Sequence, residues 1–303
     1  MNKLNKKFRN LVIFSFFIIF SFLFLNKLYF HFYDKTYEIA IILDTKKDNE
    51  LIKNGINLSA YENKVSINYI DIKNIKSIKQ IEKKIDGIII LEVFNEDIKI
   101  LEDFKKSILI LGEDIPEEVD LLISYINSDT FEMGKEIADE ILRNGNTREN
   151  IIFLSNNILT RSEKNTYKGF SSFINLSKNR IKDTIFNEKT IYEIFENNEN
   201  NIFVTFDPYI LDRICKIKYK NKDFTKKQIY GISKGNKRIN YLENNILNGV
   251  IVKNEFSLGY LGLDTIYKMV QKKPYKKSKI NFSLINKRNM YIKENQYLLF
   301  PFT

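Results

Sequence analysis

Nine strand-length apolar runs, separated by stretches with helical periodicity, constrain the fold of this chain more than any other feature. The runs are rich in β-branched residues, and most are too continuous for half-exposed strands, so they predict strands covered on both faces. Strands and helices in alternation predict parallel sheets with right-handed crossovers, and this many strands favour two doubly wound sheets over one. The runs are residues 37–43, 65–70, 87–91, 108–111, 121–126, 151–154, 202–205, 228–232 and 249–252.

Two of the intervening stretches have the apolar face of an amphipathic helix. One begins after Asp129, and Glu132 three residues later makes Asp129 a candidate N-terminal cap. The other runs from Leu258 to Val270, with apolar residues at helical spacing. Both stretches therefore predict helices that pack against a sheet.

The N-terminal run LVIFSFFIIFSFLFL, residues 11–25, contains no charged residue and follows a basic segment. It is a little short for a hydrocarbon core of about 30 Å, but residues 28–33, LYFHFY, extend it with aromatics typical of headgroup depth. The pattern predicts a single-pass signal anchor over residues 11–33 of a cell-membrane protein. Residues 1–10 would be a cytoplasmic basic tail, with the bulk of the chain extracytoplasmic.

Two alternatives to the anchor stay open, a cleaved signal peptide and a buried core helix. A signal peptide needs small residues at its cleavage site, and none of that kind follows the run. No cysteine lies directly after the run either, which excludes a bacterial lipid-anchor signal.

The formal charge of +10 does not indicate a nucleic-acid partner. Residues 1–35 carry six Lys or Arg and one Asp, so half of the excess belongs to the flanks of the apolar run. The remainder is spread over a chain that is rich in lysine throughout. A basic cluster between Lys272 and Lys279, around Pro274, is interpreted as a solvated loop.

Cysteine and histidine counts exclude several kinds of site. With one cysteine there is no internal disulfide, and Cys215 lies among apolar residues typical of a core. The only histidine, His31, adjoins the apolar run, which removes histidine-based catalysis and histidine-rich metal sites from the rest of the chain. We predict no catalytic residue, no metal and no cofactor, although counting does not exclude a hydrolase with paired carboxylates.

Polar residues follow most of the predicted strands. Ligands of open α/β sheets bind beyond the carboxyl ends of the strands, so these residues are candidates for a ligand site. Each one alone also suits a solvated loop or a helix cap. The candidates are Asp44, Glu113, Asp114, Asp207, Ser233 and Lys253.

Six segments, in this order, resemble the sugar-type (type I) periplasmic binding proteins, the family of the ribose-binding protein that also forms the core of lactose-repressor-like regulators. The resemblance covers nearly all of residues 37–300, and the membrane segment in place of a helix-turn-helix argues against the repressor branch. The segments are DGIII (86–90), SDTFEMGKEIADEI (128–141), YKGF (167–170), IFVTFD (202–207), IYGIS (229–233) and NGVIVKNEFSLGYLGLDTIYKM (248–269).

The resemblance implies two α/β lobes that close on a ligand by hinge motion. Three crossings would join them, near Asn127, Lys253 and Ile285. The N-terminal lobe would contain residues 36–127 and 254–284. The C-terminal lobe would contain residues 128–253 and 285–303.

The resemblance also implies which positions line the ligand site. The family's sugar-clamping arginine falls on Thr166, and its cleft glutamine falls on Lys253. Its Asn-Asp pair at the end of a strand falls on Phe206 and Asp207, which keeps only the second member.

Two further family motifs are altered. Gly-Phe-Asp ends here in Ser233, without a carboxylate, and Asp-Arg falls on Glu113 and Asp114, without a cation. A buried sugar hydroxyl without partners costs about 1 to 3 kcal/mol. We therefore expect the fold to transfer from the family but not its pattern of sugar binding.

Two functions then compete. In the first, a membrane-anchored, extracytoplasmic solute-binding or sensory domain captures a carbohydrate-like, amphoteric or more apolar small molecule and presents it to an ABC transporter or a sensor histidine kinase. In the second, a degenerate binding fold serves as a ligand-independent scaffold. An enzyme is the least favoured reading, and membrane lipid is a partner only through the anchor. In the first case, Lys253 and Arg161 would face Asp44, Glu113 and Asp114.

Overall fold

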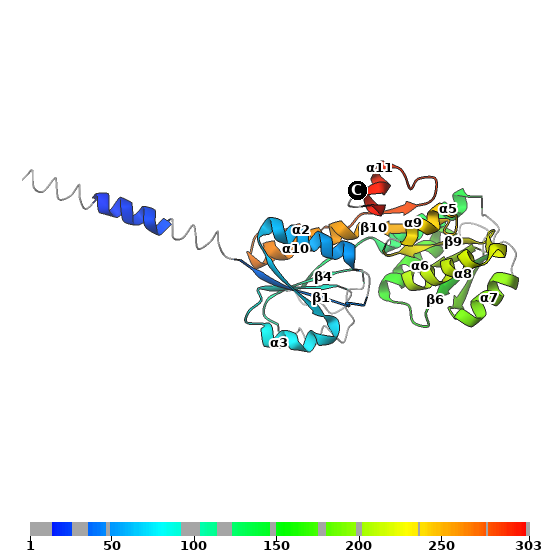
Figure 1. Ribbon diagram of the computed structural model, residues 1–303, viewed down its shortest axis with the longest axis horizontal. Coiled ribbons are helices and arrows are strands. Elements are labelled where there is room, and N and C mark those ends of the chain that lie inside the picture. Colours follow the sequence, from blue (N-terminus) through cyan, green and yellow to red (C-terminus); the bar gives the residue numbers. More distant parts are fainter. Residues whose placement is uncertain are drawn as a thin grey trace, which may run out of the picture. The chain divides into compact units, whose positions relative to one another are not determined.

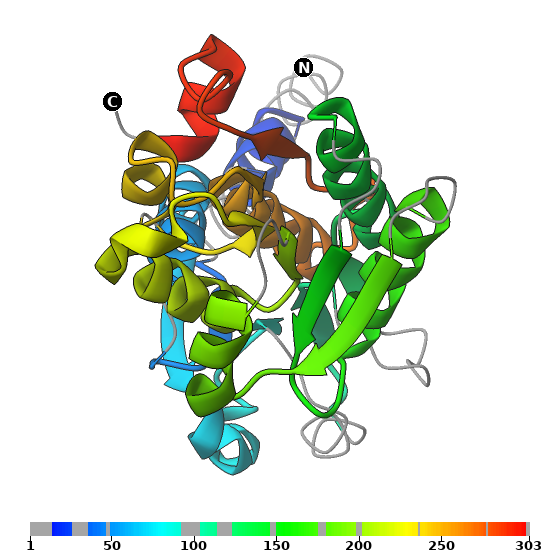
Figure 2. The same cartoon turned by 90° about the vertical axis from the view of Figure 1, so that its right-hand side faces the viewer.

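The computed structural model of the chain describes residues 14–25, 36–46, 49–91, 104–113, 123–145, 150–174, 180–197, 202–235, 237–276 and 278–300. The chain divides into two units, Met1–Tyr37 and Glu38–Thr303. The larger unit contains both sheets and all four hydrophobic clusters of the described residues, which makes it a folding unit with its own core (Figures 1 and 2).

In the smaller unit the structure describes a helix over residues 14–25 and the last two residues, 36 and 37. The phenylalanine, isoleucine and leucine side chains of this helix are exposed, and the rings of Phe20 and Phe24 stack with centroids 6.5 Å apart. Residues 11–13 and 26–33 of the expected anchor lie outside the described residues. Within the part of the chain that is described, no helix has both the length and the hydropathy required to cross a membrane.

The first sheet has five parallel strands in the order β2-β1-β3-β4-β5. Since β2 and β3 flank β1, the chain reverses direction across the sheet at β1, as at the switch point of doubly wound folds. Helices α2 (Glu50–Asn63) and α10 (Glu255–Val270) cover one face, and the 3-10 helix Ile72–Ser77 with α3 (Ile78–Ile81) covers the other. The strands are β1 (Glu38–Leu43), β2 (Ser66–Asp71), β3 (Gly87–Leu91), β4 (Ser107–Leu111) and β5 (Ile123–Ile126).

The second sheet has six strands in the order β11-β10-β9-β8-β6-β7, all parallel except the antiparallel pair of β10 and β11. One face packs against α5 (Thr130–Arg143) and α6 (Arg161–Ile174). The other packs against α7 (Glu188–Asn197), α8 (Pro208–Lys220), α9 (Lys237–Glu243) and α11 (Lys293–Leu299). The strands are β6 (Asn150–Ser155), β7 (Arg180–Ile185), β8 (Ile202–Thr205), β9 (Gln228–Ser233), β10 (Gly249–Lys253) and β11 (Phe282–Ile285).

Alternate residues of each central strand belong to different cores, because successive side chains of a strand point to opposite faces. In β1, Ile39 and Ile41 pack with α2 and α10, whereas Ala40 and Ile42 pack with α3. These four residues are 0% exposed. The predicted α/β fold with parallel strands buried on both faces is therefore confirmed.

Two helix pairs cross through glycines. Gly55 of α2 and Gly259 of α10 lie where a Cβ would overlap the backbone of the other helix, and Gly134 of α5 and Gly169 of α6 repeat this arrangement in the second lobe. Figure 1 shows α2 and α10 side by side over the first sheet. In each lobe, the helix that follows a crossing between the lobes therefore packs closely on a second helix of that lobe.

The predicted N-terminal cap of α5 is confirmed, since Asp129 Oδ1 accepts from Glu132 N–H at 3.2 Å.

The chain crosses between the lobes after β5, after β10 and before β11. The third crossing was expected near Ile285, but residues 282–285 form β11, which pairs antiparallel with β10. Residues 282–284 therefore belong to the second sheet and not to the N-terminal lobe. The crossing lies at Lys279 and Ile280, where Ile280 N–H donates to Asn127 O at 2.9 Å.

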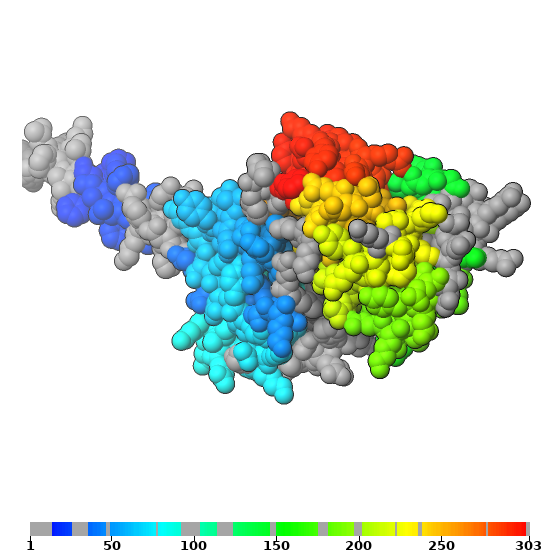
Figure 3. Space-filling view, turned by 45° about the vertical axis from the view of Figure 1, so that its right-hand side comes forward, coloured from blue at the N-terminus to red at the C-terminus, as the bar shows by residue number. Residues whose placement is uncertain are grey.

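The C-terminal segment covers α9 of the second lobe, and Figure 3 shows it in red against the yellow part of the chain. The Arg238 guanidinium donates to Leu298 O at 3.2 Å, and Tyr291 donates to Glu243 at 2.7 Å. Arg238 is only 1% exposed. This segment therefore completes the core of the second lobe.

A buried lysine makes the stability of the second lobe depend on pH. Lys218 of α8 is 3% exposed, and its ammonium donates to Asn245 O at 3.1 Å and to Ile246 O at 2.9 Å. Burial lowers its pKa from 10.5 to about 8. Between these values the unfolded chain binds the proton more tightly, so the free energy of unfolding rises with pH.

We expect this rise to be on the order of 2 kcal/mol between pH 8 and pH 10 in the wild type relative to Lys218→Met. Urea unfolding of both proteins across this range measures the difference. Tyrosines with raised pKa values, such as Tyr69 and Tyr230, act in the opposite direction but are common to both proteins. Parallel pH curves for the two proteins would refute the assignment.

Candidate functional site

An ion pair joins the strand ends of the two sheets. Lys253, the last residue of β10, places Nζ 2.8 Å from Glu113 Oε2. Glu113 follows β4 after Gly112, whose φ of 138° favours glycine. The side chains are only 13% and 15% exposed, so the pair is shielded from water. The structure thus places Lys253 opposite Glu113, as the sequence predicts.

Asp44 follows β1 and organises its own loop. Its Oδ1 accepts from Lys46 N–H at 2.9 Å, and its carbonyl accepts from the Asn49 amide at 3.1 Å. Beside it, the Thr45 hydroxyl donates to Asp71, which ends the neighbouring strand β2. The Thr45 hydrogen bond, supported by Lys73 N–H, holds the pKa of Asp71 below its ordinary value.

Asp207 follows β8 and caps α8. Its Oδ1 accepts from Tyr209 N–H at 2.7 Å and from Ile210 N–H at 3.2 Å. Its Oδ2 accepts from the amide of Asn156, which follows the adjacent strand β6, at 2.6 Å. Asp207 therefore holds a strand end and a helix start together, and a ligand would have to compete with Asn156 for it.

Thr166 and Phe206 lie in the core of the second lobe rather than on an open face. Thr166 is 1% exposed, and its hydroxyl donates to Ser162 O at 2.9 Å within α6. Phe206 is 4% exposed, with its ring centroid 5.0 Å from that of Phe153 and 5.8 Å from that of Phe170. In this structure both side chains are buried within the lobe, and their contact with a ligand stays a prediction.

The other predicted residues are dispersed. Arg161 is exposed at the start of α6. Ser233 ends β9 and is 7% exposed, with its hydroxyl 3.4 Å from Lys234 O. Asp114 lies outside the described residues.

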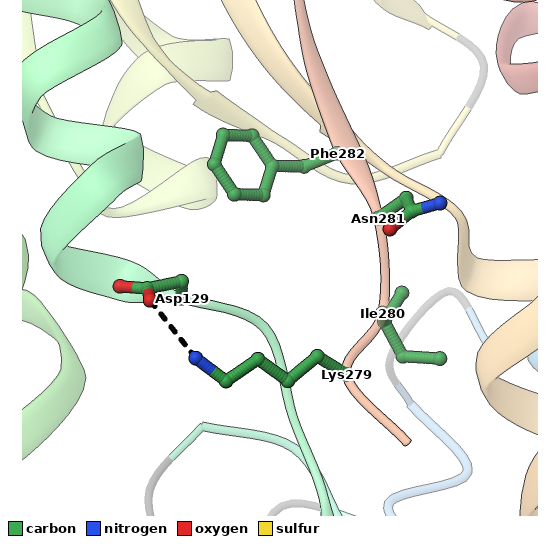
Figure 4. A pocket seen from close by; sticks show the side chains of 5 residues that line it. All are labelled: Asp129, Lys279, Ile280, Asn281 and Phe282. Carbon is green, nitrogen blue, oxygen red and sulfur yellow. Dashed lines mark hydrogen bonds and ion pairs between the residues drawn. The ribbon is translucent and has the colours of Figure 1, made fainter.

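A cavity of about 200 Å³ lies at the first and third crossings (Figure 4). Asp129 and Lys279 form an ion pair of 3.1 Å on one side, and Phe282 lies across from them. Burial raises the pKa of Asp129, but hydrogen bonds from Glu132 N–H and Lys279 outweigh it, and the pKa stays below its ordinary value. Lys279 is 74% exposed, which agrees with its interpretation as a solvated residue, and its ion pair adds a role at the crossing.

Four residues at these positions are not among those predicted from the sequence: Thr45, Asp71, Asn156 and Lys279. Asp71 directly follows the predicted strand 65–70, and Asn156 lies two residues after the predicted strand 151–154. The rule that selected Asp44 and Asp207 would have found both. Thr45 and Lys279 carried no such signal, because their partners are distant in the sequence. Within the described residues, no cluster of three or more His, Cys, Asp or Glu side chains is placed to hold a metal ion.

Hydrogen-bond donors and acceptors gather at the carboxyl ends of the strands. Two carboxylates, an ammonium and two hydroxyls stand at the carboxyl ends of the strands. Such side chains bind by charge-assisted hydrogen bonds, which are stronger than neutral ones. The residues that supply them are Asp71, Asp207, Lys253, Thr45 and Ser233.

No family model matches the sequence, and no curated protein matches it either. Solved structures do match it. GanP, a glucose-galactose binding protein from Geobacillus stearothermophilus, has a TM-score of 0.74 at 16% identity and covers 86% of this chain and 100% of its own. An ABC transporter solute-binding protein from Agrobacterium vitis, with bound D-fucose, has a TM-score of 0.77 at 15% identity, covering 87% and 100%.

XylFII, solved in a complex with LytSN, has a TM-score of 0.68 at 18% identity and covers 84% of this chain and 99% of its own. All three identities are low, so the likeness concerns the fold. Their lengths match the domain that follows the apolar helix. The chain has the two-lobed fold of the type I periplasmic sugar-binding proteins.

Proposed function

We propose that residues 38–303 form an extracytoplasmic solute-binding or sensory domain that holds a small molecule between its two lobes. The observation that carries this proposal is the Lys253–Glu113 ion pair, because it joins the carboxyl ends of strands from different sheets. Ligands of open α/β sheets bind at this end. The structural neighbours are described as binding proteins and a regulator, which supports a function without catalysis.

The ion pair also indicates the kind of ligand. A molecule that enters between Lys253 and Glu113 has to replace both partners, since an unpaired buried charge costs several kcal/mol. A small amphoteric molecule that carries both an anionic group and a cationic or hydroxyl donor satisfies this requirement. A carbohydrate-like scaffold is consistent with the neighbours that bind D-fucose and D-arabinose.

The second candidate is a ligand-independent scaffold. It is favoured because several expected ligand residues already have partners within the protein. Thr166 and Phe206 are buried, and Asp207 caps α8. In this case the Lys253–Glu113 ion pair permanently links the two lobes. The two candidates differ in whether a small molecule breaks the pair.

The N-terminal apolar segment supports a membrane tether for this domain. A helix over residues 14–25 that exposes only uncharged side chains is unfavourable in water and favourable in lipid. A tethered domain suits local capture of a solute for an ABC transporter, or signalling through a sensor kinase in the same membrane. The complex of XylFII with a second protein, LytSN, supports a partner protein by analogy of fold.

Native mass spectrometry of the full chain, purified from membranes, tests the function. We expect a bound small-molecule mass that dissociates on activation and is absent from Lys253→Met. A bare protein from every preparation would favour the scaffold. Membrane association after a carbonate wash tests the tether separately, and a mature chain that begins near residue 35 would contradict it.

A further inference from the structure

Exposed lysines precede three of the five strands of the first sheet. Lys64 lies two residues before β2, Lys83 and Lys84 lie just before β3, and Lys105 lies two residues before β4. All four side chains are exposed. In a parallel sheet, residues before each strand gather at one edge, so these positive charges share a surface.

The strand register shows how closely these starts are aligned. Glu38 of β1 pairs with Ser66 of β2, and Ile39 pairs with Gly87 of β3. Gly87 in turn pairs with Ser107 of β4. The first residues of four strands therefore form one row, at the edge opposite the strand ends that carry the candidate ligand site.

Helix α10 brings further lysines to the same edge. A Cβ built on Gly87 would lie 3.0 Å from Val270 Cγ2, so the last residue of α10 packs on the start of β3. Lys272 and Lys273 follow Val270 by two and three residues and are exposed. These two lysines and Lys279 form one cluster in the sequence. In the structure Lys279 belongs to the crossing, whereas Lys272 and Lys273 belong to this edge.

Acidic side chains at this edge are engaged or partly covered. Asp86 accepts from Glu38 N–H at 3.0 Å, and Glu62 accepts from the Tyr260 hydroxyl at 2.6 Å. Glu38 and Glu82 are half-buried. Among the described residues of the edge, exposed lysines therefore outnumber exposed carboxylates.

We propose that this basic edge, formed by Lys64, Lys83, Lys84, Lys105, Lys272 and Lys273, contacts anionic phospholipid headgroups at the membrane surface. Glu38, the residue at which the chain enters the domain, belongs to the same edge. The contact would direct the strand ends, and with them the candidate ligand site, away from the lipid. This inference deepens the proposed tether and rests on it for the identity of the surface.

Binding of residues 38–303 to vesicles tests the contact without the tether and without a solute. Each lysine near an anionic surface strengthens attachment roughly fivefold. We expect the domain to sediment with vesicles that contain phosphatidylglycerol but not with phosphatidylcholine alone, and to dissociate at high salt. Lys83→Gln, Lys84→Gln, Lys272→Gln and Lys273→Gln combined should weaken this binding by about tenfold or more.

A matched variant controls for overall charge. It replaces four exposed lysines of the second lobe by glutamine, and we expect it to bind like the wild type. Equal loss in both variants, or no binding of the wild type at low salt, would overturn the proposal whatever the outcome for solute binding or for the tether. Melting curves establish that both variants are folded. The control positions are Lys168, Lys182, Lys189 and Lys220.

The full chain gives an independent readout. In nanodiscs of phosphatidylglycerol, acetylation of Lys272 and Lys273 should be several-fold slower than in discs of phosphatidylcholine, while acetylation of Lys168 is unchanged. Equal rates for all three lysines in both lipids would contradict the contact.

Discussion

Gly259→Ala is expected to lower the free energy of unfolding by about 3 kcal/mol or more, because the new methyl group would overlap the backbone of α2. A Cβ at this position lies well inside van der Waals contact with the carbonyl oxygen of Ile52, and backbone atoms cannot rotate away as a side chain can. Gly55 of α2 makes the reciprocal approach to α10. Relieving the overlap would push α10 away from α2. Urea unfolding of the two proteins measures this loss.

Gly262→Ala is the matched control in the same helix. There the new Cβ would lie 2.6 Å from Leu111 Cδ1, the end of a flexible side chain that can change rotamer. We expect Gly262→Ala to cost less than half as much as Gly259→Ala. Equal costs would show that the close helix crossing is not what constrains position 259.

Lys253→Met is expected to lower stability by about 2 kcal/mol, because it leaves the Glu113 carboxylate shielded from water without its ammonium partner. If a solute binds at this pair, its affinity should fall at least tenfold in the same variant. Combining Lys253→Met with Glu113→Gln should recover part of the lost stability. Urea unfolding of the single and double variants gives the coupling of the pair.

Lys279→Met is the control, since Lys279 is also paired with a carboxylate between crossing segments but its side chain is 74% exposed. Exposed pairs contribute at most about 1 kcal/mol. A loss as large as that of Lys253→Met would mean that shielding does not distinguish the two pairs.

Much of the fold could be predicted from the sequence, because buried parallel strands are continuous apolar runs. The central strands β1, β3, β8 and β10 have this character. Two edge strands were missed for the same physical reason. β7 reads RIKDTI, and β11 reads FSLI in a half-exposed setting, so neither has the run of apolar residues that burial on both faces requires. The missed β11 explains the misplaced third crossing.

The site was less predictable than the fold. Strand ends can be read from the sequence, and Lys253, Glu113 and Asp207 were found in this way. The family pattern places Thr166 and Phe206 at the ligand site, but alignment identifies a backbone position and not its exposure. Both side chains are buried here. Thr166 donates to Ser162 O within α6, and Phe206 packs against Phe153 of β6.

The melting temperature of residues 38–303, measured with and without candidate solutes, shows whether the domain binds a small molecule. The compounds are sugars, amino sugars, amino acids, nucleosides and short peptides. A ligand that binds only the folded state stabilises it by about 2.7 kcal/mol at a hundred times its Kd. We expect a rise of several degrees for an amphoteric, carbohydrate-like compound, and no such rise in Lys253→Met. An unchanged melting temperature with every compound would contradict solute binding and favour the scaffold.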